Sequence, residues 1–209
     1  VINKSSGEVL LDSTLELSGT LSTLTSGSVF NMNGNRLITA GNINNAAGSA
    51  TFKIGTTDAL LEFTGTSAQT VNTGGDLLLE GVTLSHSGAG VTIAGGDLLI
   101  DTTAIITLDS GILITGTNEI VIYNSSAAAI AGGNNSSFVN GNLRRFISGN
   151  PDIYNFPVGN SLKGYQNATI EFTTSTMISD LVATFQNYPI SVTGPVSNDC
   201  SGYDYSQLP

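Results

Sequence analysis

Short apolar-polar-apolar triplets separated by Gly, Asn or Asp turns recur along the first two thirds of this chain. Such a triplet suits a half-buried strand, because successive side chains of a strand point to opposite faces. The sequence therefore predicts short strands whose middle residue faces water and whose flanking residues face a core. The triplets lie at residues 15–17, 52–54, 61–63, 82–84, 91–93 and 106–108.

One segment of this pattern is repeated. Residues 74–79 read Gly-Gly-Asp-Leu-Leu-Leu and residues 95–100 read Gly-Gly-Asp-Leu-Leu-Ile, so Gly74 in the first copy corresponds to Gly95 in the second. The two copies are offset by 21 residues. Repeats of about this length are typical of solenoids, in which each coil buries its apolar face against its neighbours. We therefore predict that Leu78 and Leu99 occupy equivalent positions in adjacent coils and that Leu99 lies in the core.

The predicted fold is all-β. A parallel β-helix (β-solenoid) of about six coils of about 21 residues is expected over residues 1–135, followed by the start of an antiparallel β-sandwich, expected to be incomplete, over residues 136–209. The second part has longer apolar segments and all five prolines. Residues 177–185 also fit the spacing of one short helix, which stays open as an alternative.

Composition excludes several classes of protein. Only 11% of the residues are charged, against roughly 25% in ordinary domains. The net charge of −10 makes nucleic acid a poor partner. No apolar run approaches the roughly 20 residues that span a bilayer, so no membrane span is expected in this segment. A single cysteine, Cys200, cannot form a disulfide within the chain, and a bridge to another chain stays open.

Three passages carry a family resemblance: Phe-Thr-Gly-Thr-Ser-Ala-Gln-Thr-Val at residues 63–71, Phe-Val-Asn-Gly-Asn-Leu-Arg-Arg at 138–145, and Asn-Phe-Pro-Val-Gly at 155–159, followed by Tyr165. The chain resembles secreted and cell-surface adhesin-like proteins of Bacteroidota. In these proteins a Thr/Gly/Asn-rich parallel β-helix leads into β-sandwich modules. The resemblance implies an extracellular or cell-surface location and a role as an adhesin or stalk.

Few residues suit catalysis or metal binding. Asp76 and Asp97 occupy the same place in the repeat, either as solvated turn residues or as ligands of a shared cation such as calcium. Leu77 and Leu98 follow directly, so the Gly-Gly-x-Gly-x-Asp calcium repeat is absent. His86 is expected in an exposed polar loop. We predict no catalytic residue, no cofactor and no metal site.

The adjacent pair Arg144 and Arg145 should point to opposite sides of a strand. The two guanidinium groups either form salt bridges at the junction with the second part or bind an acidic glycan. Most tyrosines lie in the C-terminal part of the chain. The residues expected to contact a glycan are therefore Arg144, Tyr154 and Tyr165.

The function expected from these features is that of a non-catalytic extracellular structural or adhesion segment, a stalk or surface-display module of a larger secreted protein. The alternative is a glycan-binding or polysaccharide-degrading β-helix protein. Expected partners are other modules of the same polypeptide, surface glycans, or host or cell-surface proteins. The resemblance also implies O-glycosylation after an aspartate, at Ser13 and Thr102, which occupy matching places in the repeat. The alternative is that both lie in ordinary turns whose side chains bond backbone N–H groups.

Overall fold

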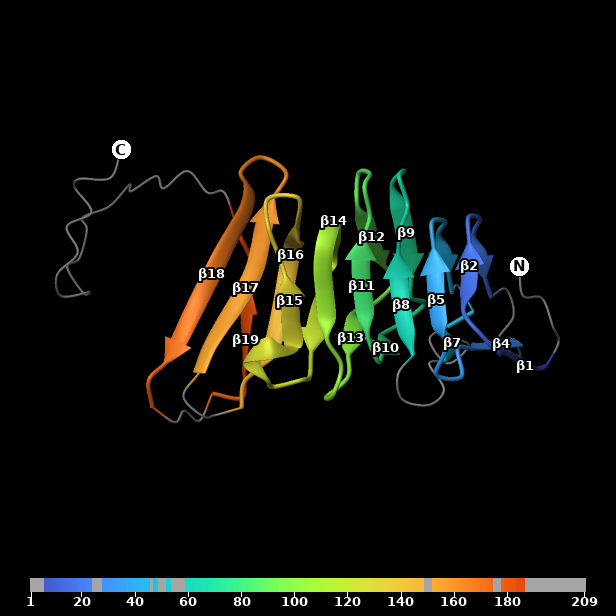
Figure 1. Cartoon of the computed structure of the whole chain (residues 1–209), viewed down its shortest axis with the longest axis horizontal. Helices are drawn as coiled ribbons and strands as arrows, with labels where there is room; N and C mark the ends of the chain where they lie inside the picture. Colours follow the sequence, from blue (N-terminus) through green and yellow to red (C-terminus); the bar gives the residue numbers. More distant parts are fainter. Residues whose placement is uncertain are drawn as a thin grey trace.

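The computed structural model shows an all-β rod in which parallel strands stack as a solenoid of about six coils (Figure 1). The structure describes residues 6–23, 28–45, 47–48, 52–53, 59–148, 152–174 and 178–186. Strands β2 and β18 lie at opposite ends of the rod. The predicted parallel β-solenoid is confirmed.

Each coil contributes three strands, and most strands at the same place in successive coils pair in parallel. The first strands of the coils are β1 (Gly7–Leu10), β4 (Ser28–Asn31), β7 (Phe52–Lys53), β10 (Leu77–Leu79) and β13 (Leu98–Ile100). The second strands are β2 (Leu15–Leu17), β5 (Arg36–Thr39), β8 (Leu60–Phe63) and β11 (Val82–Ser85). The third strands are β3 (Leu21–Ser22), β6 (Ile43–Asn44), β9 (Gln69–Asn72) and β12 (Val91–Ala94).

The long strand β14 (Ile106–Ile122) passes through three sides of the solenoid, because it pairs in parallel with β11, β12 and β13 in turn. Gly111 and Gly116 lie along this strand with φ of 94° and 61°. Glycine adopts such values without the steric cost that a side chain would bring. These two residues let the backbone turn the corners of the coil.

The strand register confirms the repeat. Residues 77, 78 and 79 pair with residues 98, 99 and 100, the same correspondence that the match between the two sequence segments predicts. Other strand pairs join residues that lie further apart in the chain. Val71 of β9 pairs with Ile93 of β12, and Asn44 of β6 pairs with Asn72 of β9. The coil length therefore varies, and the additional residues lie in the connections between strands.

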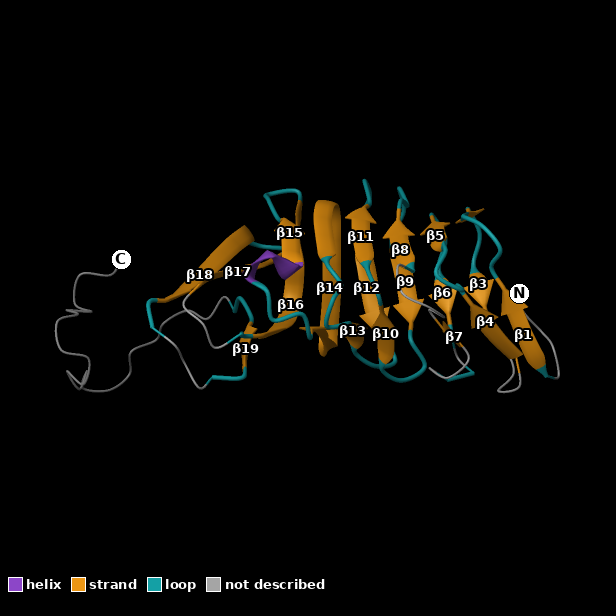
Figure 2. Cartoon of the chain, turned by 60° about the horizontal axis from the view of Figure 1, so that its bottom comes forward, coloured by secondary structure: helices purple, strands orange, loops and turns teal. Residues whose placement is uncertain are grey.

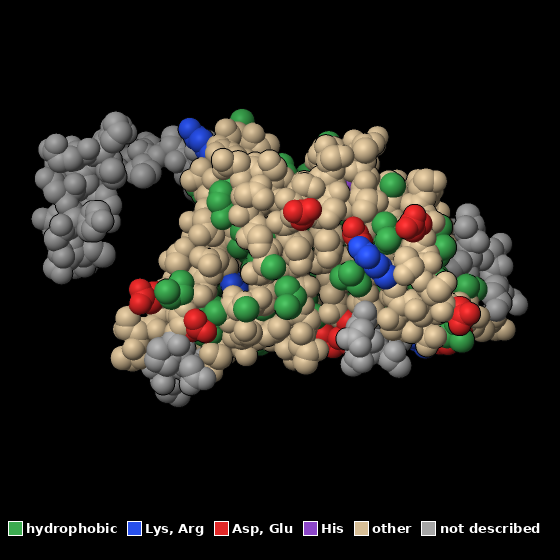
Figure 3. All heavy atoms as spheres, viewed as in Figure 1, with side chains coloured by type: hydrophobic (Ala, Val, Ile, Leu, Met, Phe, Trp, Pro, Cys, Tyr) green, Lys and Arg blue, Asp and Glu red, His purple; other side chains and the backbone are tan. Residues whose placement is uncertain are grey.

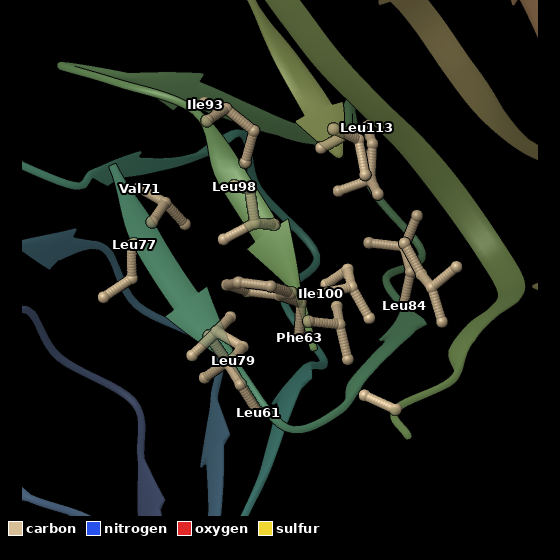
Figure 4. Close-up of a cluster of buried hydrophobic side chains, with 14 of the residues drawn as sticks. Leu61, Phe63, Val71, Leu77, Leu79, Leu84, Ile93, Leu98, Ile100 and Leu113 are labelled. Atoms are coloured by element: carbon tan, nitrogen blue, oxygen red, sulfur yellow. The ribbon is translucent and has the colours of Figure 1, made fainter. Parts of the chain in front are cut away.

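The core runs along the inside of the coils. The inward side chains of neighbouring coils converge in Figure 4, among them Leu61, Phe63, Leu84, Leu98 and Ile100, which are fully buried. Complete burial of one such side chain contributes about 1.5–3 kcal/mol. Within the described residues the triplets thus place their flanking residues inward, as predicted, whereas Glu62, a middle residue expected to face water, is buried.

The expectation that Leu99 lies in the core is wrong. Leu78 is 40% exposed and Leu99 is half-buried, whereas Leu98 and Ile100 are 0% exposed. Side chains alternate along a strand, so the middle leucine of each run must point outward. An uninterrupted apolar run hides this alternation from sequence reasoning.

Parallel stacking continues beyond residue 135. The 3-10 helix η2 (Ala127–Ala129) and strand β15 (Ile130–Gly132) lead into β16 (Ser137–Phe146), which pairs in parallel with β14 and with β17 (Asp152–Asn160). The domain boundary expected at residue 135 therefore lies inside a coil.

Antiparallel pairing begins only at the C-terminal end of the rod. Strand β17 pairs with β18 (Gly164–Phe172), and β16 pairs with β19 (Asp180–Ala183). Figure 2 shows these strands continuing the sheet at the end of the stack. Within the described ranges they add strands to an existing sheet, and the facing second sheet of a sandwich is not among them. Residues 180–183 form a strand rather than the alternative helix, and Met177 and Cys200 lie outside the described residues.

Candidate functional site

The side chain of Arg145 lies inside the last coil and is fully buried. Its Nη1 donates to the carbonyl oxygen of Asn155 at 2.7 Å, and its Nη2 donates to those of Ser126 at 2.9 Å and Ala127 at 3.0 Å. Burial lowers the pKa of Arg145 to about 10, which leaves the guanidinium protonated at neutral pH. A cation held by three backbone carbonyls thus joins η2 to β17.

Two aromatic rings lie beside the buried guanidinium group of Arg145. The guanidinium carbon of Arg145 lies 5.3 Å from the ring centre of Tyr154 and 5.7 Å from that of Phe156, within range of cation-π attraction. The Tyr154 hydroxyl donates to Ser125 O at 3.2 Å and accepts from Ser148 N at 3.1 Å. Tyr154 is fully buried, so it offers no surface to a glycan in this structure, contrary to the expectation for this residue.

Arg144 points to the other side of the sheet, as the alternation of a strand predicts. Its Nε donates to Glu119 at 2.7 Å and its Nη1 donates to Asp180 at 2.6 Å. These hydrogen bonds, that of Glu119 first, raise the pKa of Arg144. The Ser179 hydroxyl, followed by Arg144, lowers the pKa of Asp180. Arg144 thus clamps β19 onto the solenoid, and an acidic glycan would have to displace two carboxylates to bind it.

The repeated aspartates form hydrogen bonds between coils. The Asp76 carboxylate accepts from the backbone N–H of Asp97 at 3.0 Å, and the Asp97 carboxylate accepts from the N–H of Glu119 at 2.8 Å. Each acid therefore ties one coil to the next. Among the described residues, no group of three His, Cys, Asp or Glu side chains is placed to hold a metal ion.

A second ladder of polar side chains lies inside the solenoid. Thr23 donates its hydroxyl to Asn45 at 2.5 Å, and the Asn45 amide donates to the Thr73 carbonyl at 2.9 Å. The Thr73 hydroxyl donates in turn to Ala94 O at 3.0 Å. Thr23, Asn45 and Thr73 are buried. Sequence reasoning missed this ladder, whose only signal is a polar residue directly after the third strand of successive coils.

His86 is fully buried, so the prediction of an exposed loop histidine is wrong. Its Nδ1 accepts from the Gly88 N–H at 3.1 Å, and its Nε2 lies 2.8 Å from the Ser67 carbonyl oxygen. This arrangement assigns the ring proton to Nε2. The polar flanking residues suggested a solvated loop, but the corner of the coil encloses the ring and uses both nitrogens to satisfy backbone groups.

The two residues expected to be glycosylated are exposed at matching corners. Ser13 follows β1 and Thr102 follows β13. The backbone N–H and the hydroxyl of Thr102 both donate to the Asp101 carboxylate, at 2.5 and 3.1 Å. Thr102 therefore belongs to a local turn of the kind that Asp and Thr often form.

Tyr165, the third residue expected to contact a glycan, is half-buried beside Phe138, with 6.4 Å between the ring centres. On the same outward face of the β17–β18 hairpin, Thr169 donates to the Asn155 side chain at 3.0 Å, and Asn167 donates to Asn155 at 3.3 Å and to Thr169 at 3.0 Å. These three polar side chains are exposed. Tyr165 and this network share one face and do not meet Arg144.

The view in Figure 3 shows a face that is mostly uncharged, with only a few acidic and basic side chains on it. No helix within the described ranges is long and apolar enough to cross a membrane. Comparison with protein-family models, with curated proteins and with solved structures finds no match. The functional argument therefore depends on the geometry of the chain itself.

Proposed function

We propose that this chain is a non-catalytic extracellular structural or adhesion segment, which acts as a stalk or surface-display module of a larger secreted protein. The single observation that carries the proposal is that polar side chains along the rod form hydrogen bonds to neighbouring coils. Asp76, Asp97, Asn45 and Thr73 bond a neighbouring coil rather than converge on a cleft. The family resemblance adds the cell-surface location.

The ion pairs follow the same pattern. Glu8 pairs with Lys53 at 2.9 Å, Arg36 pairs with Glu62, and Arg144 joins β16 to β19. Each of these contacts links separate strands along the rod. Charged side chains engaged in this way stabilise an elongated shape, which is what a spacer between a cell surface and a binding module requires.

The test of the proposal is an assay for turnover. We expect the purified chain to release no reducing sugars from a panel of acidic and neutral polysaccharides. Reproducible release would contradict the proposal if Asp152→Asn or Glu171→Gln abolished it. Both acids line a shallow hollow at the open end of the β17–β18 hairpin together with Ile153, Phe172 and Thr173, and carboxylates are the groups that glycoside hydrolysis uses.

A glycan-binding role is the second candidate, and the exposed network of Asn155, Asn167 and Thr169 beside Tyr165 favours it. Amide and hydroxyl groups on a flat sheet face can bond sugar hydroxyls, and an aromatic ring can stack on a sugar. Saturable binding on a glycan array would support this role if Asn167→Ala removed it. Gln166→Ala is the matched control, because Gln166 is also exposed on β18 but points to the opposite face.

A further inference from the structure

The inward residues of the first coil are less well covered than those of the next coil. Val9, Leu15 and Leu17 are only partly buried, and we call these three residues the N-terminal floor. Phe30 and Leu37, which pair with Val9 and Leu15 one coil further along, are 2% and 0% exposed. The core is therefore incompletely covered at this end of the rod.

The strand edges at the two ends of the rod also differ. Strands β1, β2 and β3 stand at the ends of their sheets, and within the described ranges they pair only with β4, β5 and β6. At the other end, the outermost described strands β18 and β19 run antiparallel to their neighbours, and each pairs with one strand. Among the described strands, those at the N-terminal end keep the three edges that a parallel coil would need for pairing.

We infer that the N-terminal floor is a docking surface for one further parallel β-coil that carries a basic side chain opposite Glu16. The inference rests on the proposed stalk function, since a stalk consists of stacked units. The same backbone pairing and apolar packing that join the existing coils would continue into the docked coil.

The charge of the partner follows from the contacts that the solenoid already makes. Arg36 pairs in register with Leu60, and its guanidinium reaches Glu62, two residues further along β8. Glu16 is exposed in the same stacked row as Glu62. A Lys or Arg at the place of Arg36 in a docked strand would therefore reach Glu16.

A second copy of this chain fits the surface poorly. Residues 6–23 contain Glu8, Asp12 and Glu16 and no Lys or Arg. Two copies that met floor to floor would bring these acids together, and like charges across strands are destabilising. A coil with basic character is the better complement.

The test adds such a coil to the full chain. A copy of residues 28–45 is fused directly before Val1, so that residues 1–5 provide a connection similar in length to residues 24–27. We expect hydrogen exchange of the β1 and β2 amides to slow by about tenfold or more in the fusion, because paired amides exchange only on opening. Leu37→Asp in the added copy should remove the protection, and Arg36→Glu in the copy should reduce it. Unchanged exchange in β1 and β2 would overturn the inference.

Sedimentation velocity of the unmodified chain identifies the competing occupant. We expect a monomer across the micromolar range. A concentration-dependent dimer that Leu15→Lys abolishes would assign the floor to a second copy and overturn the proposed occupant. Neither experiment measures turnover of polysaccharides, so failure of the docking inference remains distinguishable from failure of the stalk proposal.

Discussion

Leu78 and Leu99 pair in neighbouring parallel strands, and both side chains point away from the core. The adjacent Leu98 is 0% exposed inside the coil. One residue therefore separates a position that faces the core from one that faces the surface.

The first prediction compares these two positions. Leu98→Asp buries an unpaired carboxylate and should destabilise the protein by about 4 kcal/mol or more. Leu99→Asp is the matched control and should cost less than about 1 kcal/mol, because the carboxylate can reach water. Urea denaturation measures both. Equal losses of stability would show that the strand faces are assigned wrongly.

The second prediction concerns the buried arginine. Arg145→Ala removes the buried donor that three backbone carbonyls share and should destabilise the fold by about 3–5 kcal/mol. Arg144→Ala breaks two partly exposed ion pairs and should cost no more than about 1 kcal/mol. Thermal and urea unfolding of the two variants provide the comparison. A larger loss of stability for Arg144→Ala would contradict the structural role of the buried Arg145.

The third prediction is a pH dependence of β19. The pKa of Asp180 is lowered in the folded protein, first by Ser179 and then by Arg144. An acid with a lowered folded pKa contributes stability above its unfolded pKa, about 3.9, and loses that contribution as pH falls through the folded value. Amides of β19 should therefore exchange faster at pH 3 than at pH 6, after correction for intrinsic rates. Asp180→Asn should remove this difference, and a difference that persisted in Asp180→Asn would assign the effect to another group.

The fourth prediction concerns His86, whose two ring nitrogens satisfy backbone groups of Gly88 and Ser67. His86→Ala removes the buried ring that both part-buried backbone groups bond and should destabilise the fold by about 2–4 kcal/mol. Ser87→Ala, at an exposed neighbouring position, should change stability by less than about 0.5 kcal/mol. Equal stability of His86→Ala and the parent protein would indicate that His86 lies in an exposed loop.

The fifth prediction comes from the family resemblance. Ser13 and Thr102 are expected to carry O-linked glycans in protein secreted by the native host, because both hydroxyls lie at exposed corners after an aspartate. Peptide mass spectrometry of native material measures this, with Ser87 as an exposed serine that does not follow an aspartate. Unmodified masses for both peptides would count against the modification and would leave Thr102 as a turn residue only.

Sequence reasoning was sufficient for the parallel β-solenoid, though not for the strands that follow it, because the repeat fixes the strand register. The match of residues 74–79 with 95–100 leads directly to the observed pairing of β10 with β13. The alternating triplets also gave the correct inward residues, such as Val82 and Leu84 around Thr83.

The candidate site was less accessible to sequence reasoning, because the surroundings of each polar residue depend on coils distant in the chain. The buried position of His86 depends on Ser67 in the preceding coil, and Arg145 depends on Ser126 and Ala127. In a leucine run such as residues 77–79, polar and apolar residues do not alternate, so the sequence does not show which side chains face the core. The extent of the solenoid was underestimated because β16 is longer than most of the earlier strands and its pattern resembles a sandwich strand.

The distance between spin labels at Glu16 and Ala131 shows whether the coils form one rigid stack. These exposed positions belong to one row of paired residues that passes through Ile38, Glu62, Thr83 and Thr107. Five strand spacings separate them, about 24 Å between Cα atoms. We expect one narrow distribution of label-to-label distances near that value, after allowance for the label linkers. A broad distribution, or a single distance far from this value, would contradict the stack.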